Sequence, residues 1–299
     1  MSFFTKRILT AVLMIVAVVG IGVFAFVGLS KKALETPPVV VPKKSEPVEE
    51  IIGRSVEGRA ITAYRYGTGT GAELVFVGGM HGGYEWNSVL LSYTFMDYLS
   101  ANPEVIPAGL AITVVPSVNP DGVYKVTGKE GRFGITDVAT DTEVLASGRF
   151  NANDVDLNRN FDCKWKPKAT WQQRDVSAGK APFSEPEAAA IRDFALKHRP
   201  AVFVFWHSKA NAVYASECEK GILPETLDSM NAYAQASGYQ AVTSFGAYAV
   251  TGDSEGWLAS IGIPAITVEL STHETIEWEK NLSGIKALFD YFGLVGKQK

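Results

Sequence analysis

The stretch Leu74-Val75-Phe76-Val77-Gly78-Gly79-Met80-His81-Gly82-Gly83-Tyr84-Glu85 places a histidine and a carboxylate just beyond a short apolar run. The run is typical of a buried β-strand, and the glycines that follow end it and leave room for a ligand to approach. In α/β proteins, binding sites gather where strands end at one edge of the sheet. We therefore expect His81 and Glu85 to face a site at such an edge.

Strand-like and helix-like segments alternate along the chain after residue 50. The predicted strands are Ile61–Tyr66, Glu73–Val77, Ala111–Pro116, Ala201–Trp206, Ala212–Ala215 and Ala265–Leu270. The predicted helices are Trp86–Leu99, Ser184 (as the capping residue) to about His198, Pro224–Ser237 and Glu277–Phe292. This alternation, with nearly continuous apolar strands, predicts an α/β fold: a mixed, mostly parallel sheet with helices on both faces.

The N-terminus differs from the rest in composition. An uncharged apolar run extends from Ile8 to Leu29, behind Lys6 and Arg7. At about 1.5 Å per residue it would reach roughly 33 Å, enough to cross a bilayer. The hydrophobic part of a signal peptide is shorter, about 7–15 residues. We therefore expect residues 1–30 to be an uncleaved membrane anchor, with a cleaved signal peptide as the alternative.

Residues 31–50 interleave Pro37, Pro38, Pro42 and Pro47 with lysines and glutamates. This composition predicts an extended, solvated linker between the membrane and a domain formed by residues 51–299. That length suits a single α/β domain.

The net charge and the two cysteines limit the classes of function that the chain can have. A net charge of -4 gives no support for nucleic-acid binding, which requires a basic surface. Cys163 and Cys218 are the two cysteines, and their spacing excludes a CxxC site. Because export would place them where disulfides persist, we expect a Cys163–Cys218 bridge; two buried thiols are the alternative.

A second predicted strand also ends in a histidine, in Val202-Phe203-Val204-Phe205-Trp206-His207-Ser208. Two such strands can bring their histidines together at one edge of a sheet. Catalytic zinc takes three protein ligands, and two histidines with one glutamate are a known set. A single histidine after an apolar run is more often a packing residue, but the pairing favours a zinc site formed by His81, Glu85 and His207.

The two remaining histidines fit other roles. His198 lies at the expected C-terminus of a helix, where a histidine interacts favourably with the last carbonyls. His273 follows a strand but has no ligand spacing around it.

Glu269 stands at the end of the apolar segment Pro264–Leu270. A carboxylate there is costly to bury without a partner or a task. In a desolvated cleft its pKa would rise toward the range of a general base. The alternative is a salt bridge at the edge of the sheet.

The polar segment Gly148–Phe161 contains Arg149 and Arg159. Arginines make forked contacts with carboxylates and can stabilise an oxyanion. On composition alone, the segment is also typical of a solvated loop.

Together, these segments resemble the zinc carboxypeptidase family, the carboxypeptidase A-like or funnelin metallopeptidases, over nearly all of the chain beyond the linker. The matching motifs, in the family's order, are Ile52–Arg59, His81 with Glu85, Asn119–Gly122, Val155–Phe161, Phe183–Glu187, Trp206–Ser208 and Thr267–Leu270. Each motif is weak alone, and their order makes the resemblance strong.

The resemblance implies a set of site residues and one Zn²⁺. It gives His81, Glu85 and His207 as zinc ligands, Asp156 as the partner orienting His81, Glu269 as general base and acid, Arg149 (or alternatively Arg132) as oxyanion stabiliser, Asn158 and Arg159 as carboxylate clamp, Tyr248 as a mobile cover and Glu255 at the base of the side-chain pocket. The chain departs from the family in two respects. Its spacing is His-x-x-x-Glu where His-x-x-Glu is usual, and the segment before Asn158 and Arg159 is rearranged, which leaves Arg132 as the alternative to Arg149. Glu255 has an alternative interpretation as an exposed loop acid.

These observations predict a zinc metallocarboxypeptidase that removes C-terminal residues from peptides. An acid at Glu255 would favour a basic or diamino-acid C-terminal residue. A desuccinylase, deacylase or cell-wall peptide hydrolase of the same fold, or a non-catalytic peptide-binding module, remain alternatives. We expect the domain to lie outside the cytoplasm, which means the periplasm or the cell surface if the organism is a bacterium. It would be held there by the N-terminal helix, or secreted if that helix is cleaved.

Overall fold

A computed structural model describes residues 46–295 of the chain. The predicted membrane anchor and most of the predicted linker lie outside these residues. Within the described range, every helix is too short or too polar to cross a bilayer.

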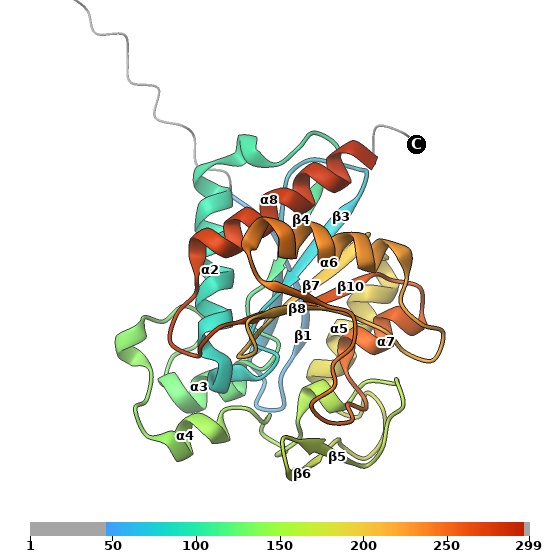
Figure 1. The fold of residues 1–299 in the computed structure, drawn as a ribbon. Helices are drawn as coiled ribbons and strands as arrows, with labels where there is room; N and C mark the ends of the chain where they lie inside the picture. Colours follow the sequence, from blue (N-terminus) through green and yellow to red (C-terminus); the bar gives the residue numbers. More distant parts are fainter. Residues whose placement is uncertain (1–45, 296–299) are drawn as a thin grey trace, which may run out of the picture. The chain divides into compact units, whose positions relative to one another are not determined.

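An eight-stranded mixed sheet forms the centre of the domain, in the order β1-β2-β4-β3-β7-β10-β8-β9 (Figure 1). Its strands are β1 Val48–Arg54, β2 Ala60–Tyr66, β3 Glu73–Val77, β4 Ala111–Val115, β7 Val202–Ser208, β8 Ala212–Ala215, β9 Gln240–Val242 and β10 Ala265–Leu270. The four central strands, β4, β3, β7 and β10, are parallel to one another. Antiparallel pairs flank them, β2 with β4 and β8 with β10. The mixed sheet with a parallel centre is confirmed.

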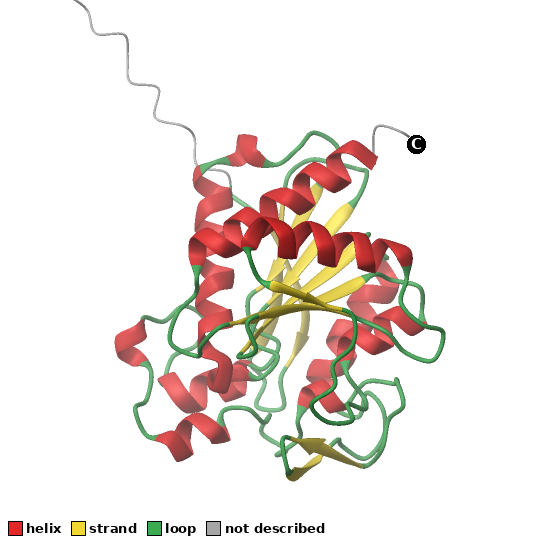
Figure 2. Ribbon diagram, viewed as in Figure 1, coloured by secondary structure: helices red, strands yellow, loops and turns green. Residues whose placement is uncertain are grey.

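Helices cover both faces of the sheet (Figure 2). The longer ones are α2 Trp86–Ala101, α5 Pro186–His198, α6 Pro224–Ser237 and α8 Trp278–Val295, and the shorter ones are α3 Pro120–Thr127, α4 Thr142–Ser147 and α7 Ser254–Ser260. Alternate side chains of each central strand enter different cores, because successive residues of a strand point to opposite faces. Leu74 and Phe76 pack with α2, α6 and α8, whereas Val75 and Val77 pack with α5 and α7.

Every predicted strand and helix is present with bounds within three residues of the prediction, whereas β1, β9, α3, α4 and α7 were not predicted. The start of α5 is Pro186, with Glu185 as the extended N-cap residue, so Ser184 is not the cap. The reason is that a residue before proline is restricted to extended backbone. β1 begins at Val48 and pairs with β2, so the sheet begins three residues inside the predicted linker.

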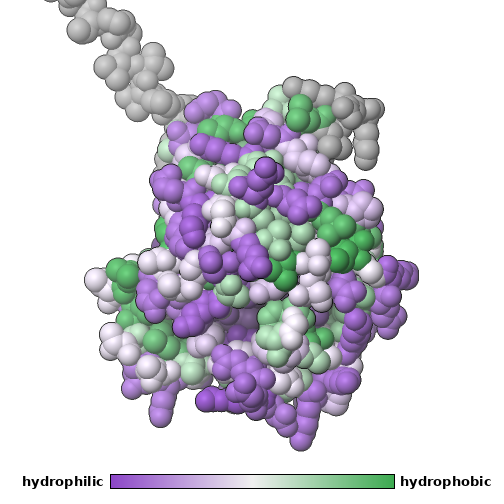
Figure 3. Space-filling model, viewed as in Figure 1, coloured by the Kyte–Doolittle hydropathy of each residue, from purple (hydrophilic) through white to green (hydrophobic). Residues whose placement is uncertain are grey.

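The face in Figure 3 is largely polar, with apolar residues in small groups rather than in one broad patch. This distribution agrees with the two buried cores, which take up most of the large apolar side chains. The surface in this view therefore gives no sign of an extended apolar docking site.

Cys163 and Cys218 form the predicted disulfide, with their Cα atoms 6.1 Å apart. The bridge joins the segment after Arg159 to the segment after β8. It closes a loop of 55 residues, which the chain-entropy model associates with a stabilisation of roughly 4 kcal/mol.

We expect the double substitution Cys163→Ala/Cys218→Ala to lower the free energy of unfolding by about 2–4 kcal/mol. Urea unfolding followed by circular dichroism measures the change, with the unreduced parent protein as reference. A difference below about 0.5 kcal/mol would show that the bridge does not restrict the unfolded chain as expected.

Candidate metal centre and active site

The glycine corner after β3 sets the positions of His81 and Glu85. A Cβ atom on Gly78 would lie 2.4 Å from Ser92 Oγ, and Gly79 has a φ of +61°. Only glycine therefore fits this corner without strain. The chain then forms a 3₁₀ turn, η1 Gly82–Glu85, that returns Glu85 to His81, with His81 Nδ1 2.8 Å from Glu85 Oε1. The turn accommodates the additional residue between the two side chains.

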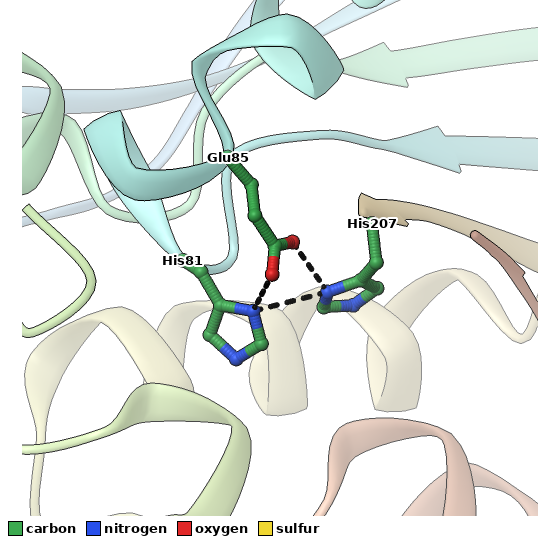
Figure 4. Close-up of side chains that lie close together, drawn as sticks. All are labelled: His81, Glu85 and His207. Carbon is green, nitrogen blue, oxygen red and sulfur yellow. Dashed lines mark hydrogen bonds and ion pairs between the residues drawn. The ribbon is translucent and has the colours of Figure 1, made fainter. Parts of the chain in front are cut away.

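His207 reaches the same place from the neighbouring strand. β7 is parallel to β3, with Val77 opposite Phe205, so His207 lies at the edge of the sheet where β3 ends. Its Nδ1 atom is 2.9 Å from Glu85 Oε2 and 3.2 Å from His81 Nδ1. Figure 4 shows the three side chains converging from η1 and from the end of β7. Their ligand atoms all lie within 4.8 Å of one another.

This cluster fits a zinc ion. Two imidazoles and one carboxylate are a zinc donor set, and all three residues are at least 95% buried. Both Nδ1 atoms face the centre of the cluster. Both Nε2 atoms face outward toward carboxylates, His81 toward Asp156 Oδ1 at 3.4 Å and His207 toward Glu255 Oε1 at 3.4 Å. That orientation leaves the Nδ1 atoms as the metal-binding nitrogens.

Charge balance around the cluster also suits a cation. Burial opposes the ionisation of Glu85, but His81 and His207 outweigh it and hold the pKa of Glu85 well below its usual value. Burial likewise opposes the ionisation of Asp156, while Arg149 and Arg159 hold its pKa well below the usual value. Two carboxylates are thus kept negative beside the histidines.

A cavity of about 940 Å³ opens beside this cluster. Of the residues predicted from sequence, it is lined by His81, Glu85, Arg149, Asn158, Arg159, His207, Tyr248, Glu255 and Glu269. Asp156 lies behind this lining and is fully buried. Cys163 also contributes to the wall.

The two arginines considered for the oxyanion lie in different places. Arg149 is buried against the cluster, where it donates to Asp156 Oδ2 from Nε at 3.0 Å and from Nη2 at 2.8 Å. Its Nη1 atom is 3.7 Å from Glu85 Oε1. Arg132 pairs on the surface with Asp97 at 3.0 Å and does not line the cavity. The geometry therefore favours Arg149.

Hydrogen bonds to neighbouring segments fix the side chains of Asn158 and Arg159. Asn158 Oδ1 accepts from the backbone N–H of Ser254 at 2.8 Å. Arg159 donates to the carbonyl of Thr170 from Nε and Nη2, and to the carbonyl of Asn158 from Nη1. These contacts fix both side chains and leave the Asn158 amide nitrogen and two guanidinium N–H groups to donate to a ligand.

Glu269 lies on the cavity wall beside His207, its partner in the parallel register of β7 and β10. Its Oε2 atom is buried and has no hydrogen-bond partner among the described residues. Burial, reinforced by the charge of Glu85, raises the pKa of Glu269 to about 8. The salt bridge considered from sequence is not formed by the described residues, so Glu269 is available for proton transfer.

Tyr248 and Glu255 line the cavity at different depths. Tyr248 is half-buried in the loop before α7 and packs edge to face on Phe245, with ring centroids 4.9 Å apart. Glu255 is in the first turn of α7 and only 3% exposed, so it is not the exposed loop acid considered as an alternative.

Sequence reasoning missed the small hairpin of β5 Lys168–Trp171 and β6 Arg174–Ser177. Trp171 lies against the Arg149 guanidinium, 4.5 Å from its centre, and Thr170 supplies the carbonyl that holds Arg159. The hairpin thus supports both arginines. Alternation of apolar residues at Ala169 and Trp171 was the signal available in the sequence.

His273, to which the sequence analysis gave no role, also lines the cavity. Its Nδ1 atom is 2.7 Å from the hydroxyl of Ser208, which donates to Asn87 Oδ1 at 3.0 Å. Because the Ser208 hydroxyl donates its one proton to Asn87, it accepts a hydrogen bond from His273, and His273 Nδ1 therefore carries a proton. Its position after β10 was the only signal in the sequence.

Among the described residues, the fold and this site define an α/β metalloprotein whose metal centre consists of two histidines and one glutamate. The model of the zinc carboxypeptidase family matches residues 43–287. The chain belongs to the zinc carboxypeptidase family, whose members are metallopeptidases, and the resemblance seen in the sequence is confirmed.

Two curated relatives and one solved structure to which the chain is similar carry the names of three different activities. The gamma-D-glutamyl-L-diamino acid endopeptidase 1 of Lysinibacillus sphaericus is 27% identical over 74% of this chain and 60% of that protein. The carboxypeptidase B of Astacus astacus is 26% identical over 79% of this chain and 76% of that protein. The murein-tripeptide amidase MpaA from Escherichia coli O157 has the same fold, with a TM-score of 0.61 and 24% identity over 85% of this chain and 96% of that chain. The chain thus spans less than two thirds of the length of the first of these relatives.

We expect the protein to bind one equivalent of zinc and His207→Ala to retain less than about half an equivalent, because one of three ligands is lost. Zinc content after gel filtration, measured by atomic absorption, tests this. His198→Ala is the matched control, since His198 ends α5 and does not line the cavity. Equal zinc in the two variants would contradict the assignment of His207.

Proposed function

We propose that the protein is a zinc-dependent metallocarboxypeptidase that cleaves the last amide bond of peptides, with preference for a basic or diamino-acid residue at the C-terminus. The observation that carries the proposal is the convergence of three kinds of group in one cavity. These are a metal centre, an unpartnered carboxylate at Glu269 and a pair of fixed C-terminal carboxylate donors at Asn158 and Arg159.

The metal would be held by His81, Glu85 and His207. Zinc bound there supplies a Lewis acid that polarises a carbonyl group and lowers the pKa of water. The remaining chemistry belongs to the side chains of the chain itself.

Glu269 takes the proton from the attacking water and delivers it to the leaving amine. Its raised pKa suits both steps, because a carboxyl group near pKa 8 holds and releases a proton close to neutral pH. Arg149, anchored on Asp156, keeps Nη1 directed toward the metal ligands and stabilises the charge that develops on the carbonyl oxygen.

Asn158 and Arg159 fix the C-terminus of the substrate. Forked donation from a guanidinium matches the geometry of a carboxylate, and the hydrogen bonds from Ser254 and to Thr170 keep the clamp rigid. Tyr248, in the loop next to the cavity, covers the bound residue. Because Asn158 and Arg159 bind a terminal carboxylate, they favour peptides whose C-terminus lies at this point of the cavity.

A second candidate is an amide hydrolase of the same fold that acts on cell-wall peptides. The names of two similar proteins support it, since one is an endopeptidase for gamma-D-glutamyl-L-diamino acid bonds and the other a murein-tripeptide amidase. Asp253, the residue that precedes α7, also lines the cavity, and a carboxylate there favours a cationic group on the substrate in either case.

We further propose that the domain acts outside the cytoplasm. The Cys163–Cys218 bridge supports this location, because disulfides persist in oxidising compartments.

We expect the zinc-loaded protein to release C-terminal lysine or a C-terminal diamino acid faster than C-terminal leucine. A panel of matched peptides, acyl-amino acids and muropeptides, with products identified by mass spectrometry, measures the order. Release of diamino acids from muropeptides alone would select the second candidate. Cleavage of acyl-amino acids without release of any C-terminal peptide residue would reject the carboxypeptidase assignment.

We expect Glu269→Gln to lower kcat by about 10²–10⁴-fold while the zinc content stays at the parent value, because proton transfer is lost and the ligands remain. Glu274→Gln, on an exposed residue of the following loop, is the control. Near-normal turnover of Glu269→Gln would show that another group is the base.

A further inference from the structure

Glu255 lies in an unexpected place for an acid that receives a substrate side chain. Its Oε1 atom is 3.4 Å from His207 Nε2, a buried nitrogen that has no hydrogen-bond partner among the described residues. The Glu255 carboxylate is therefore placed to interact with the His207 ring.

The other contacts of Glu255 hold it in this position. Oε1 also accepts from Thr267 Oγ1 at 3.0 Å, and Oε2 accepts from Ser254 Oγ at 2.8 Å. Both oxygens are engaged, and the side chain is 3% exposed. Thr267 lies on β10 and Ser254 begins α7, so two elements fix the carboxylate against His207.

The arrangement repeats the one at the other histidine. His81 presents Nδ1 to the cluster and Nε2 to Asp156 Oδ1, also at 3.4 Å. His207 presents Nδ1 to the same cluster and Nε2 to Glu255. A carboxylate behind a metal-binding histidine holds the proton on the outer nitrogen, orients the ring and increases the basicity of the inner nitrogen.

We propose that Glu255 is a positioning residue for the metal ligand His207, the counterpart of Asp156 behind His81, and not the acid that selects the substrate side chain. The proposal rests on the zinc centre of the proposed function. It assigns the selection of a cationic side chain to other groups of the cavity, because the Glu255 oxygens are already occupied.

The affinity of the purified full chain for zinc tests this proposal. We expect Glu255→Met, which keeps the approximate volume and removes the acceptor, to weaken zinc binding about 10–100-fold in competition with a fluorescent chelator. Glu255→Gln keeps an acceptor for the Nε2 proton, and we expect it to restore part of the lost affinity. Glu217→Gln is the matched control, because Glu217 lines the same cavity but is exposed and paired with Lys164. It should bind zinc as the parent does.

Circular dichroism and thermal unfolding of the metal-free variants separate a folding defect from a loss of affinity. If Glu255→Met does not fold, the zinc affinities of Glu255→Gln and of the control Glu217→Gln are compared instead. Equal zinc affinities of these two variants overturn the proposal.

A second readout uses the ratio of kcat/KM for C-terminal lysine to that for C-terminal leucine. We expect Glu255→Gln at saturating zinc to leave this ratio unchanged. Parent-like zinc affinity with a collapsed ratio would make Glu255 the specificity acid and overturn the proposal. Failure of the parent protein to bind zinc would instead reject the metal centre itself, so the two failures are distinguishable.

Discussion

The site depends on the parallel pairing of β3 with β7. Because both strands run in the same direction and Val77 lies opposite Phe205, the residues that follow them emerge at one edge of the sheet. The Gly78–Gly79 corner then returns the chain toward β7, and the carboxylate of Glu85 contacts both histidines. A shift of one residue in this register would turn His207 to the opposite face and separate the ligands.

A buried polar network joins motifs that are distant in sequence. Ser55 donates to Asp121 at 2.6 Å, and Asn151 donates to both Glu185 and Glu187, at 2.8 and 3.1 Å. All of these residues except Asn151 come from the segments that carry the family resemblance. Their hydrogen bonds hold the loop that begins at Arg149, so several of the motifs serve to build the site rather than to touch the substrate.

Much of the fold was predictable because its signals are local. The runs that became β3, β8 and β10 have the predicted bounds, and α6 begins at Pro224 and ends before Gly238 as expected. The short elements were harder. The β5–β6 hairpin and α7 have few apolar residues of their own, and they form where tertiary contacts, such as Trp171 on Arg149, support them.

Within the site, residue types were easier to predict than contacts. His81, His207 and Glu269 follow apolar strands, so their meeting at one edge followed from sheet geometry. The sequence could not distinguish Arg149 from Arg132, because the difference lies in burial and in the pairing of Arg149 with Asp156. It also could not show that Glu255 faces His207, since that contact depends on how α7 packs against β10.

The disulfide has a consequence for the cavity as well as for stability. Cys163 is part of the cavity wall, and its carbonyl accepts from the backbone N–H of Gly252 at 2.7 Å, beside the turn that carries Glu255. The covalent bond therefore ties the segment after the carboxylate clamp to Cys218, which follows the lining residues Ser216 and Glu217. The bridge therefore limits how far the part of the cavity wall at Cys163 can move away from the segment that follows β8.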